Sequence, residues 1–179
     1  MRRSVLGPVL GLLMLPAACV APKAPPPAPP PAPVAPPPAP PPAPLSSDWR
    51  DWPVTGGDWS YRPGAGGSSA TFGRLGATPE LSVQCDRATR RITLARAGVL
   101  VPGKSARLTL RATEGATTYA VSDAGGAPPR VAATVAASDP FLDKIAFSRG
   151  RVLVQLDGAQ DIVVPNWAEF ARVVEDCRG

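Results

Sequence analysis

The sequence contains no histidine among its 179 residues. Histidine is the usual general base of serine and cysteine hydrolases and the most common metal ligand. Its absence therefore excludes Ser-His-Asp and Cys-His nucleophile systems and the common zinc sites. Charged residues make up only 18% of the chain. We expect no enzymatic activity, no bound metal and no cofactor.

Basic residues are not concentrated in the part of the chain that can fold. The formal net charge is +5, but Arg2, Arg3 and Lys23 precede residue 46, after which there are sixteen basic and fourteen acidic residues. Nearly all the basic residues are arginine, a bias that a GC-rich genome produces without selection for an anionic partner. We therefore expect no nucleic-acid partner.

Residues 1–19 have the pattern of a secretory signal peptide. Arg2 and Arg3 precede an apolar run over residues 5–15, and Ala17 and Ala18 stand before a cysteine. The run is too short and too interrupted by proline to span a membrane comfortably.

The residues that end at Cys19 resemble the lipobox of bacterial lipoproteins, in which the cysteine becomes the lipidated first residue of the mature chain. Leu15 lies one place further from the cysteine than that pattern has it, and Pro16 takes its place. The resemblance implies a lipid anchor on Cys19, and Val20 in place of aspartate implies the outer membrane. Cleavage by the ordinary signal peptidase and an uncleaved inner-membrane anchor are the alternatives.

Residues 20–45 form a proline-rich linker. Fifteen of the twenty-four residues at positions 21–44 are proline, and an eleven-residue pattern from Pro25 returns from Pro36. Each proline fixes φ and removes a backbone donor, so we expect a polyproline II rod, roughly 75 Å long at about 3.1 Å per residue. A spacer is favoured over a Pro-x-x-Pro docking ligand, because only Lys23 supplies the charge that usually flanks such ligands.

Residues 46–179 are long enough for one globular domain. The chain has three cysteines. If Cys19 carries lipid, Cys85 and Cys177 remain as a pair in an oxidising compartment. Cys85 lies on the apolar side of an alternating strand pattern, and Cys177 lies on the apolar stripe of a helical pattern. We expect a disulfide between them, with two free thiols as the alternative.

Alternating apolar and polar residues predict a mainly β fold. The clearest hairpin joins residues 81–85 and 91–95 through a polar turn, and Asp157-Gly158 is a second hairpin signal. We expect an antiparallel sandwich or barrel with a short internal helix and a C-terminal helix. The expected strands are residues 58–62, 70–72, 81–85, 91–95, 107–111, 118–121, 131–135, 152–156 and 162–164.

The short internal helix should begin at Asp139, an N-cap residue followed by proline at the first helical position. Gly150 is well placed to end it. Its buried side would hold Phe141, Leu142, Ile145 and Phe147.

The final helix should begin at Asn166, the only asparagine, which stands three residues before Glu169 as in a capping box. Helical spacing predicts a buried stripe of Trp167, Phe170, Ala171, Val174 and Cys177.

Four of the ten aromatic residues lie within thirteen positions: Trp49, Trp52, Trp59 and Tyr61. Exposed rings in such a group can stack on sugars, so these residues are a candidate ligand surface for the glycan strands of peptidoglycan. The alternative, which we favour, is that the rings close the open edge of the core.

Two further groups of residues invite a functional interpretation. Arg149 and Arg151 flank Gly150 and could hold an anion, although a helix end explains the glycine equally well. Six arginines could form one basic surface, but a solvated outer face is favoured: Arg87, Arg90, Arg91, Arg96, Arg107 and Arg111.

Residues 98–105 match the phosphate-binding pattern GxxxxGK[ST]. The residues inside the loop are bulky, and a strand pattern rather than a helix follows, so we interpret Pro102-Gly103 as a turn. Asp157 and Asp161 could in principle serve as a carboxylate pair acting on a glycan. Both lie at a hairpin turn, where aspartate is common for conformational reasons.

The order of features after residue 46 resembles that of uncharacterised sphingomonad-type periplasmic lipoproteins. The resemblance rests on the tryptophan-rich start, the cysteine-bearing hairpin, residues 145–151 and residues 165–177. The plan of strands and final helix is more distantly similar to invasion-associated locus B proteins and to an accessory periplasmic factor of type VI secretion. The resemblance implies no catalytic residue.

We therefore expect a non-catalytic periplasmic lipoprotein, anchored in the outer membrane, whose domain binds or scaffolds peptidoglycan or another envelope protein. An inhibitor of a wall-degrading enzyme is the first alternative, since small disulfide-bonded β lipoproteins include lysozyme inhibitors. A glycan-acting enzyme is the second.

Overall fold

The computed structural model describes residues 45–179. The expected signal peptide, Cys19 and all but the last residue of the proline-rich linker lie outside the described residues. The described part forms two antiparallel sheets and two α-helices, preceded by one 3₁₀ turn, η1 (Trp49–Asp51). The expected mainly β fold with an internal and a C-terminal helix is confirmed. Each sheet has two outer strands, so the two sheets do not close into a barrel.

The larger sheet has six strands in the order β1-β2-β3-β4-β8-β7. The first four are consecutive hairpins, and β8 pairs with β4 after the chain has passed through the other sheet. The strands are β1 (Asp58–Gly64), β2 (Gly67–Gly73), β3 (Leu81–Asp86), β4 (Arg91–Ala97), β7 (Ser122–Gly125) and β8 (Arg130–Ala136).

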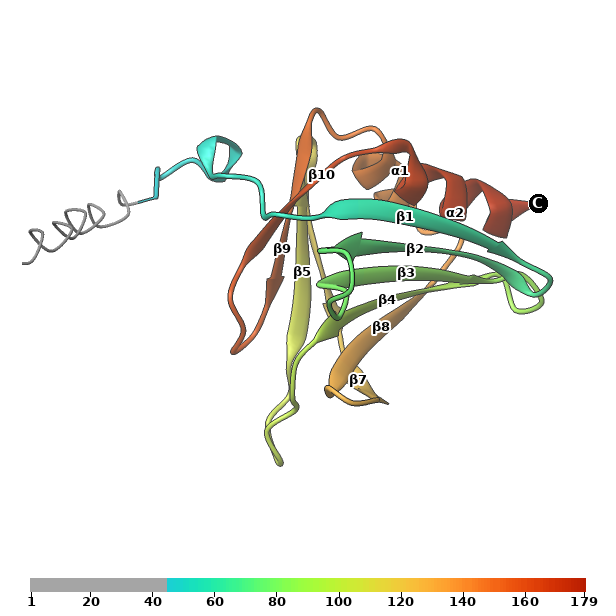
Figure 1. Ribbon diagram of the computed structural model, residues 1–179, viewed down its shortest axis with the longest axis horizontal. Coiled ribbons are helices and arrows are strands. Elements are labelled where there is room, and N and C mark those ends of the chain that lie inside the picture. Colours follow the sequence, from blue (N-terminus) through green and yellow to red (C-terminus); the bar gives the residue numbers. More distant parts are fainter. Residues whose placement is uncertain (1–44) are drawn as a thin grey trace, which may run out of the picture. The chain divides into compact units, whose positions relative to one another are not determined.

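The smaller sheet has four strands in the order β10-β9-β5-β6. Its strands run across those of the larger sheet in the view of Figure 1. The strands are β5 (Arg107–Ala112), β6 (Gly115–Ala120), β9 (Arg151–Leu156) and β10 (Ile162–Pro165).

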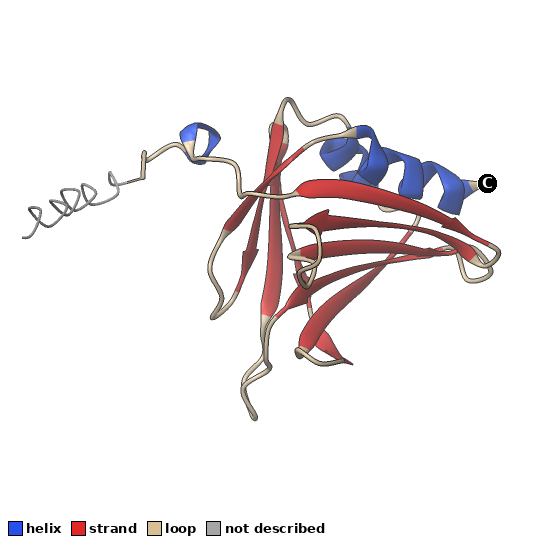
Figure 2. Ribbon diagram, in the orientation of Figure 1, coloured by secondary structure: helices blue, strands red, loops and turns tan. Residues whose placement is uncertain are grey.

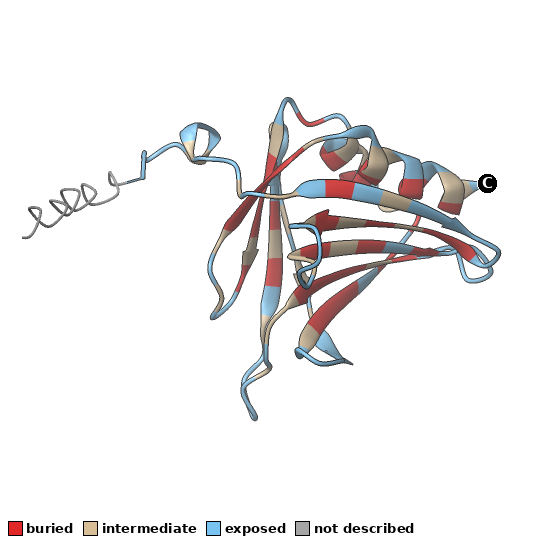
Figure 3. Cartoon of the chain, viewed as in Figure 1, coloured by how far each residue is buried: buried red, intermediate tan, exposed pale blue. Residues whose placement is uncertain are grey.

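Alternation along the strands places one set of side chains in the core. In β3, Leu81, Val83 and Cys85 are buried, whereas Ser82 and Gln84 are partly or fully exposed. Figure 3 shows the same alternation on neighbouring strands. The space between the sheets is filled: the internal void beside Trp59 is only about 10 Å³, room for about one water molecule.

The two helices lie together on one side of the larger sheet (Figure 2). Helix α2 (Ala168–Arg178) buries Phe170, Val173, Val174 and Cys177. Helix α1 (Pro140–Ala146) buries Phe141, Leu142 and Ile145, and Asp139 caps it by accepting a hydrogen bond from Phe141 N at 2.8 Å. Within residues 45–179, neither helix is long and apolar enough to cross a membrane.

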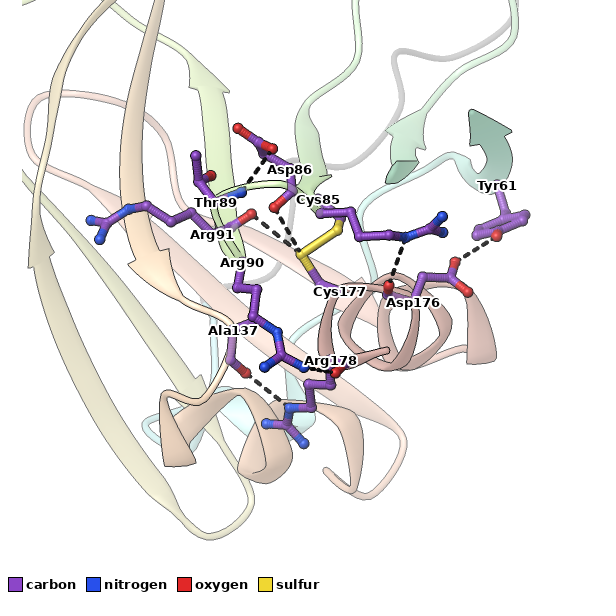
Figure 4. The surroundings of a disulfide bond; sticks show 11 residues. Tyr61, Cys85, Asp86, Thr89, Arg90, Arg91, Ala137, Asp176, Cys177 and Arg178 are labelled. Atoms are coloured by element: carbon purple, nitrogen blue, oxygen red, sulfur yellow. Dashed lines mark hydrogen bonds between the residues drawn. A yellow bond between two sulfur atoms is a disulfide. The ribbon is translucent and has the colours of Figure 1, made fainter. Parts of the chain in front are cut away.

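The predicted disulfide joins Cys85 of β3 to Cys177 of α2, with their Cα atoms 5.4 Å apart (Figure 4). Both cysteines are buried. Gly67 lies against this bridge, where a Cβ atom would come within 2.2 Å of the Cys85 carbonyl oxygen. Because φ of Gly67 is +144°, a side chain there would also be strained.

The turn between β3 and β4 holds the carboxyl end of α2. Arg87 Nε donates to the carbonyl of Asp176 at 3.4 Å, and Arg90 donates to that of Arg178. Cationic groups at this end of a helix pair its unsatisfied carbonyls and oppose the negative end of its dipole. Figure 4 shows Arg90 beside Arg178, at the end of the helix that carries Cys177.

Arg96 of β4 is buried, with only 3% of its surface exposed. Its terminal nitrogens donate to the carbonyl of Val154 at 3.2 Å and to that of Gln160 at 2.6 Å, which ties the two sheets together. Burial lowers the pKa of the Arg96 guanidinium, and the nearby charges of Glu80 and Asp161 oppose that shift. Arg96 therefore lies neither on a basic surface nor on the solvated outer face that the sequence favoured for it, so that expectation is wrong for this residue.

Several local expectations were wrong. The strand expected at residues 118–121 is the second half of β6, which begins earlier, at Gly115, and β7, which follows at Ser122 in the other sheet, was not expected. The internal helix ends at Ala146, four residues before Gly150, and Phe147 is 80% exposed. In the final helix, Trp167 is the N-cap residue without a side-chain cap, and 45% of its surface is exposed.

We expect Cys85→Ser or Cys177→Ser to destabilise the domain by about 4 to 5 kcal/mol, because the bridge closes a loop of 92 residues. The melting temperature should fall by roughly 10 to 20 °C, measured by circular dichroism under oxidising conditions. Reductant should lower the melting temperature of the parent chain and leave both variants unchanged. Equal melting of parent and variants without reductant would contradict the prediction.

Candidate functional site

The structure separates the four aromatic residues of the candidate ligand surface. Trp59 is buried, donates from Nε1 to the Pro165 carbonyl at 2.8 Å and packs against Phe72 with ring centroids 5.6 Å apart. Tyr61 is half-buried and donates from its hydroxyl to Asp176 at 2.6 Å. These two rings fasten β1 to the rest of the domain, so they do not form a platform.

Trp49 and Trp52 lie in the segment of residues 46–55, which we call the N-terminal strap. The carboxyl-terminal part of the strap is hydrogen-bonded to the smaller sheet. Arg151 donates to the Trp52 carbonyl at 2.6 Å. Thr55 exchanges two hydrogen bonds with Val163, from Thr55 N to the Val163 carbonyl and from Val163 N to Thr55 Oγ1.

The strap covers the outer face of the smaller sheet. Leu153 pairs with Arg111 of β5 and with Val163 of β10, so all three lie on one face of that sheet. Arg111 is exposed, which identifies that face as the outer one, yet Leu153 and Val163 are only 2% and 3% exposed. The sequence carried a sign of this burial in the uninterrupted apolar runs at residues 152–154 and 162–164, because a strand that is buried on both faces does not alternate between apolar and polar residues.

A groove lies between the strap and the outer face of the smaller sheet. Its volume is about 450 Å³ and it is open to solvent. The strap contributes Ser47, Asp48, Trp49 and Arg50, and the sheet contributes Arg111, Ala112, Gly115 and Ala116.

The charges in the groove are arranged around one indole ring. The Arg50 guanidinium lies 5.3 Å from the centroid of the Trp49 ring and 3.3 Å from a carboxylate oxygen of Asp48. The hydrogen bond from Arg50 N to Asp48 is the main cause of the lowered pKa of that carboxyl group. Asp48 is therefore ionised at neutral pH and offsets the charge of Arg50.

Arg111 supplies the positive charge of the opposite wall. Its Nε donates to Gln155 Oε1 at 3.0 Å, which fixes the direction of the side chain. No described residue accepts a hydrogen bond from its terminal nitrogens. A guanidinium with an open edge recognises carboxylates well, because two parallel N–H groups match two carboxylate oxygens.

A second exposed feature is the loop of residues 147–150, which we call the Phe147 loop. Asn166 Nδ2 donates to the carbonyls on both sides of Phe147, to Ala146 at 3.0 Å and to Ser148 at 2.6 Å. The buried Ser148 hydroxyl donates to the Arg151 carbonyl and accepts from Thr113 N, each at 2.9 Å. The loop is thus held by side chains of neighbouring elements, with Phe147 pointing into solvent.

The expected capping box at Asn166 is therefore wrong. Asn166 uses its amide as a donor to the Phe147 loop, and the side chain of Glu169 has one buried oxygen, Oε2, without a partner among the described residues.

The other residues that the sequence analysis named as candidates do not lie together in one site. Asp157 pairs with Arg107 at 3.4 Å, and Asp161 accepts from Gln155 at 2.7 Å, both away from the groove. The interpretation of Pro102-Gly103 as a turn is confirmed: Lys104 N donates to the Val101 carbonyl, and β5 follows the loop. Arg151 contacts the strap, as described above, and Arg149 is exposed.

No group of three histidine, cysteine, aspartate or glutamate side chains within residues 45–179 is placed to hold a metal ion. Comparisons with protein-family models, curated proteins and solved structures found no match. The fold and the groove define an antiparallel two-sheet domain with one disulfide, a covering helix and an open polar groove.

Asn166→Asp separates the two roles considered for this residue. Aspartate is a good N-cap, so the substitution would be neutral or stabilising if residue 166 capped α2. In the structure its side chain must donate to two carbonyls, which a carboxylate cannot do, and we expect a loss of about 1 to 3 kcal/mol. Chemical denaturation measures the loss, and Asn166→Ala should destabilise to a similar extent. An unchanged midpoint for Asn166→Asp would contradict the donor role.

Proposed function

We propose that this protein is a non-catalytic binding module of the bacterial periplasm. In this proposal a lipid on Cys19 anchors it to the outer membrane, and the proline-rich linker of residues 20–45 carries the domain away from the anchor. The resemblance to sphingomonad-type periplasmic lipoproteins supports this location. Roughly 75 Å of extended linker would allow the domain to reach the cell wall.

The observation that carries the proposal is the groove beside the strap. It combines the ring of Trp49 with the open guanidinium edge of Arg111 on a disulfide-bonded domain. An aromatic ring offers a stacking surface for a sugar, and guanidinium groups bind carboxylates. Peptidoglycan presents both chemical groups, because its glycan strands carry short peptides with free carboxylates.

Substitutions in the groove should weaken binding to peptidoglycan. We expect Arg111→Gln to lower the affinity of the full chain for purified peptidoglycan by about tenfold or more, since a charged hydrogen bond contributes about 1.5 to 3 kcal/mol. Trp49→Ala should weaken it as well, through the loss of ring contact. Co-sedimentation in detergent solution over a range of peptidoglycan concentrations gives the affinity.

Two matched variants control for charge and for aromatic surface. Arg107→Gln removes a guanidinium from the same strand, β5, outside the groove, and Trp167→Ala removes an exposed indole elsewhere. Both should bind as the parent does. Non-saturable binding by the parent, or equal losses for Arg107→Gln and Arg111→Gln, would refute the assignment of the groove.

A second candidate function, inhibition of a wall-degrading enzyme, is supported by the Phe147 loop. Phe147 is 80% exposed on a backbone that is fixed by hydrogen bonds on both sides. A bulky side chain on a preorganised loop can enter the cleft of another protein with little loss of entropy on binding. The flanking Lys144 and Arg149 are suited to the carboxylates that glycan hydrolases carry in their clefts.

If the protein is such an inhibitor, Phe147→Ala should abolish most of the inhibition while leaving the melting temperature unchanged. Lysis of cell-wall suspensions by purified muramidases, with and without the full chain, measures the effect. Leu75→Ala, at a fully exposed leucine in the loop between β2 and β3, is the control and should inhibit as the parent does. Absence of inhibition by the parent over a panel of muramidases would exclude this candidate.

A further inference from the structure

The two sheets have four edge strands, and three of them are protected against pairing with another strand. Edge strands expose unpaired N–H and C=O groups, and natural proteins blunt them with proline, charge, bulges, short length or a covering segment. β1 contains Pro63 and the charged Asp58 and Arg62. β7 has only four residues and an irregular register with β8 at Asp123/Gly125. β10 is covered by the strap through Thr55.

β6 has none of these protections. Its six residues, Gly115 to Ala120, include no proline and no charged side chain, and its register with β5 is continuous. Within residues 45–179, no backbone group of β6 has a hydrogen-bond partner other than β5. Its outward residues Ala116, Thr118 and Ala120 are exposed.

We propose that β6 pairs antiparallel with β6 of a second copy of this chain, about a twofold axis at Thr118. The two smaller sheets would then form one continuous sheet of eight strands. Such an isologous contact uses the same strand on both copies and closes at the dimer. The inference does not depend on the proposed function.

The sequence of β6 suits pairing with itself. Directly opposite residues in an antiparallel pair lie on the same face of the sheet. A twofold axis between two identical strands must therefore place one residue opposite its own copy. With the axis at Thr118, Thr118 meets its own copy and Ala116 meets Ala120 on the outer face, while Thr117 meets Tyr119 on the other face, so no charged side chain lies in the contact. Within one copy the hydroxyls of Thr109 and Thr118 are already 2.9 Å apart. Pairing would extend this contact into a row of four threonines, Thr109 and Thr118 of each copy. Threonines opposite each other on neighbouring strands form favourable pairs.

The nearest charges do not oppose the contact. Arg107 and Arg111 are the neighbours of Ala120 and Ala116 on β5. In the dimer, Arg111 of one copy and Arg107 of the other would be three strand spacings apart, roughly 14 Å. This separation exceeds the screening length at physiological ionic strength, about 8 Å. The groove residues Gly115 and Ala116 lie at the start of β6, and the axis at Thr118 keeps the centre of the contact away from the strap.

Sedimentation velocity of the full chain in detergent solution tests the proposal. The parent should form a dimer as its concentration rises, and Thr118→Lys should remain a monomer, because two lysines would then meet on the axis. Ser60→Lys places the same charge on the outward side of the protected edge strand β1 and should dimerise as the parent does. A parent chain that stays monomeric throughout, or equal disruption by Ser60→Lys, would overturn the proposal.

Oxidative cross-linking tests the register and does not depend on how well Thr118→Lys folds. Cα atoms of directly opposite residues lie about 4.5 to 5.5 Å apart, within the range that a disulfide spans. Thr118→Cys should therefore give much more covalent dimer than the parent chain. Cross-linking of the parent measures the background from Cys19. Ala120→Cys lies opposite residue 116 of the partner and should not. Equal cross-linking of both variants would show random collision and would refute this pairing.

Discussion

The docking of α2 against the larger sheet is the constraint on which the rest of the domain depends. The sheet is made of local hairpins on β1 to β4, and these alone leave one apolar face open. α2 covers that face with Phe170, Val173 and Val174, and the bond from Cys177 to Cys85 fixes it there. A short helix of eleven residues would be marginal by itself, so its stability comes from this packing. The arginines of the β3–β4 turn complete the attachment because they pair the last carbonyls of the helix.

The sequence predicted the fold wherever large apolar residues alternate with polar ones, as in β3, β4 and β5. It predicted the disulfide because two independent periodicities placed Cys85 and Cys177 on buried sides. It failed where one local sequence pattern is compatible with two different local structures. Asn166 three residues before Glu169 has the pattern of a capping box, but the carbonyls of the Phe147 loop compete for its amide, and no local pattern shows them. β7 was missed because all four of its residues are exposed, so it has no apolar alternation.

The candidate site was only partly predictable from the sequence. The cluster of aromatic residues before residue 62 marked the right region, but their division between core and surface depends on what each strand covers. Trp59 lies in the core because of the alternation of β1, whereas the strap lies over the outer face of the smaller sheet, where Leu153 and Val163 are buried. Arg111 and its groove could not be predicted, because β5 and the strap are distant in sequence and meet only in the folded domain.

The way the strap is attached bears on how the groove could bind a ligand. Its hydrogen bonds to the sheet are made at Trp52 and Thr55, after η1. Before Trp52, the bonds of the strap are internal: Ser46 accepts from Trp52 Nε1 through its carbonyl, and Asp48 accepts from Arg50 N. The wall that carries Trp49 and Arg50 is therefore a self-contained turn, fastened at one end. The opposite wall belongs to a sheet whose arginine is fixed by Gln155. A ligand that contacts both walls would bridge the sheet and a turn attached to it through a short segment, so its binding should hold the turn against the sheet without disturbing the core.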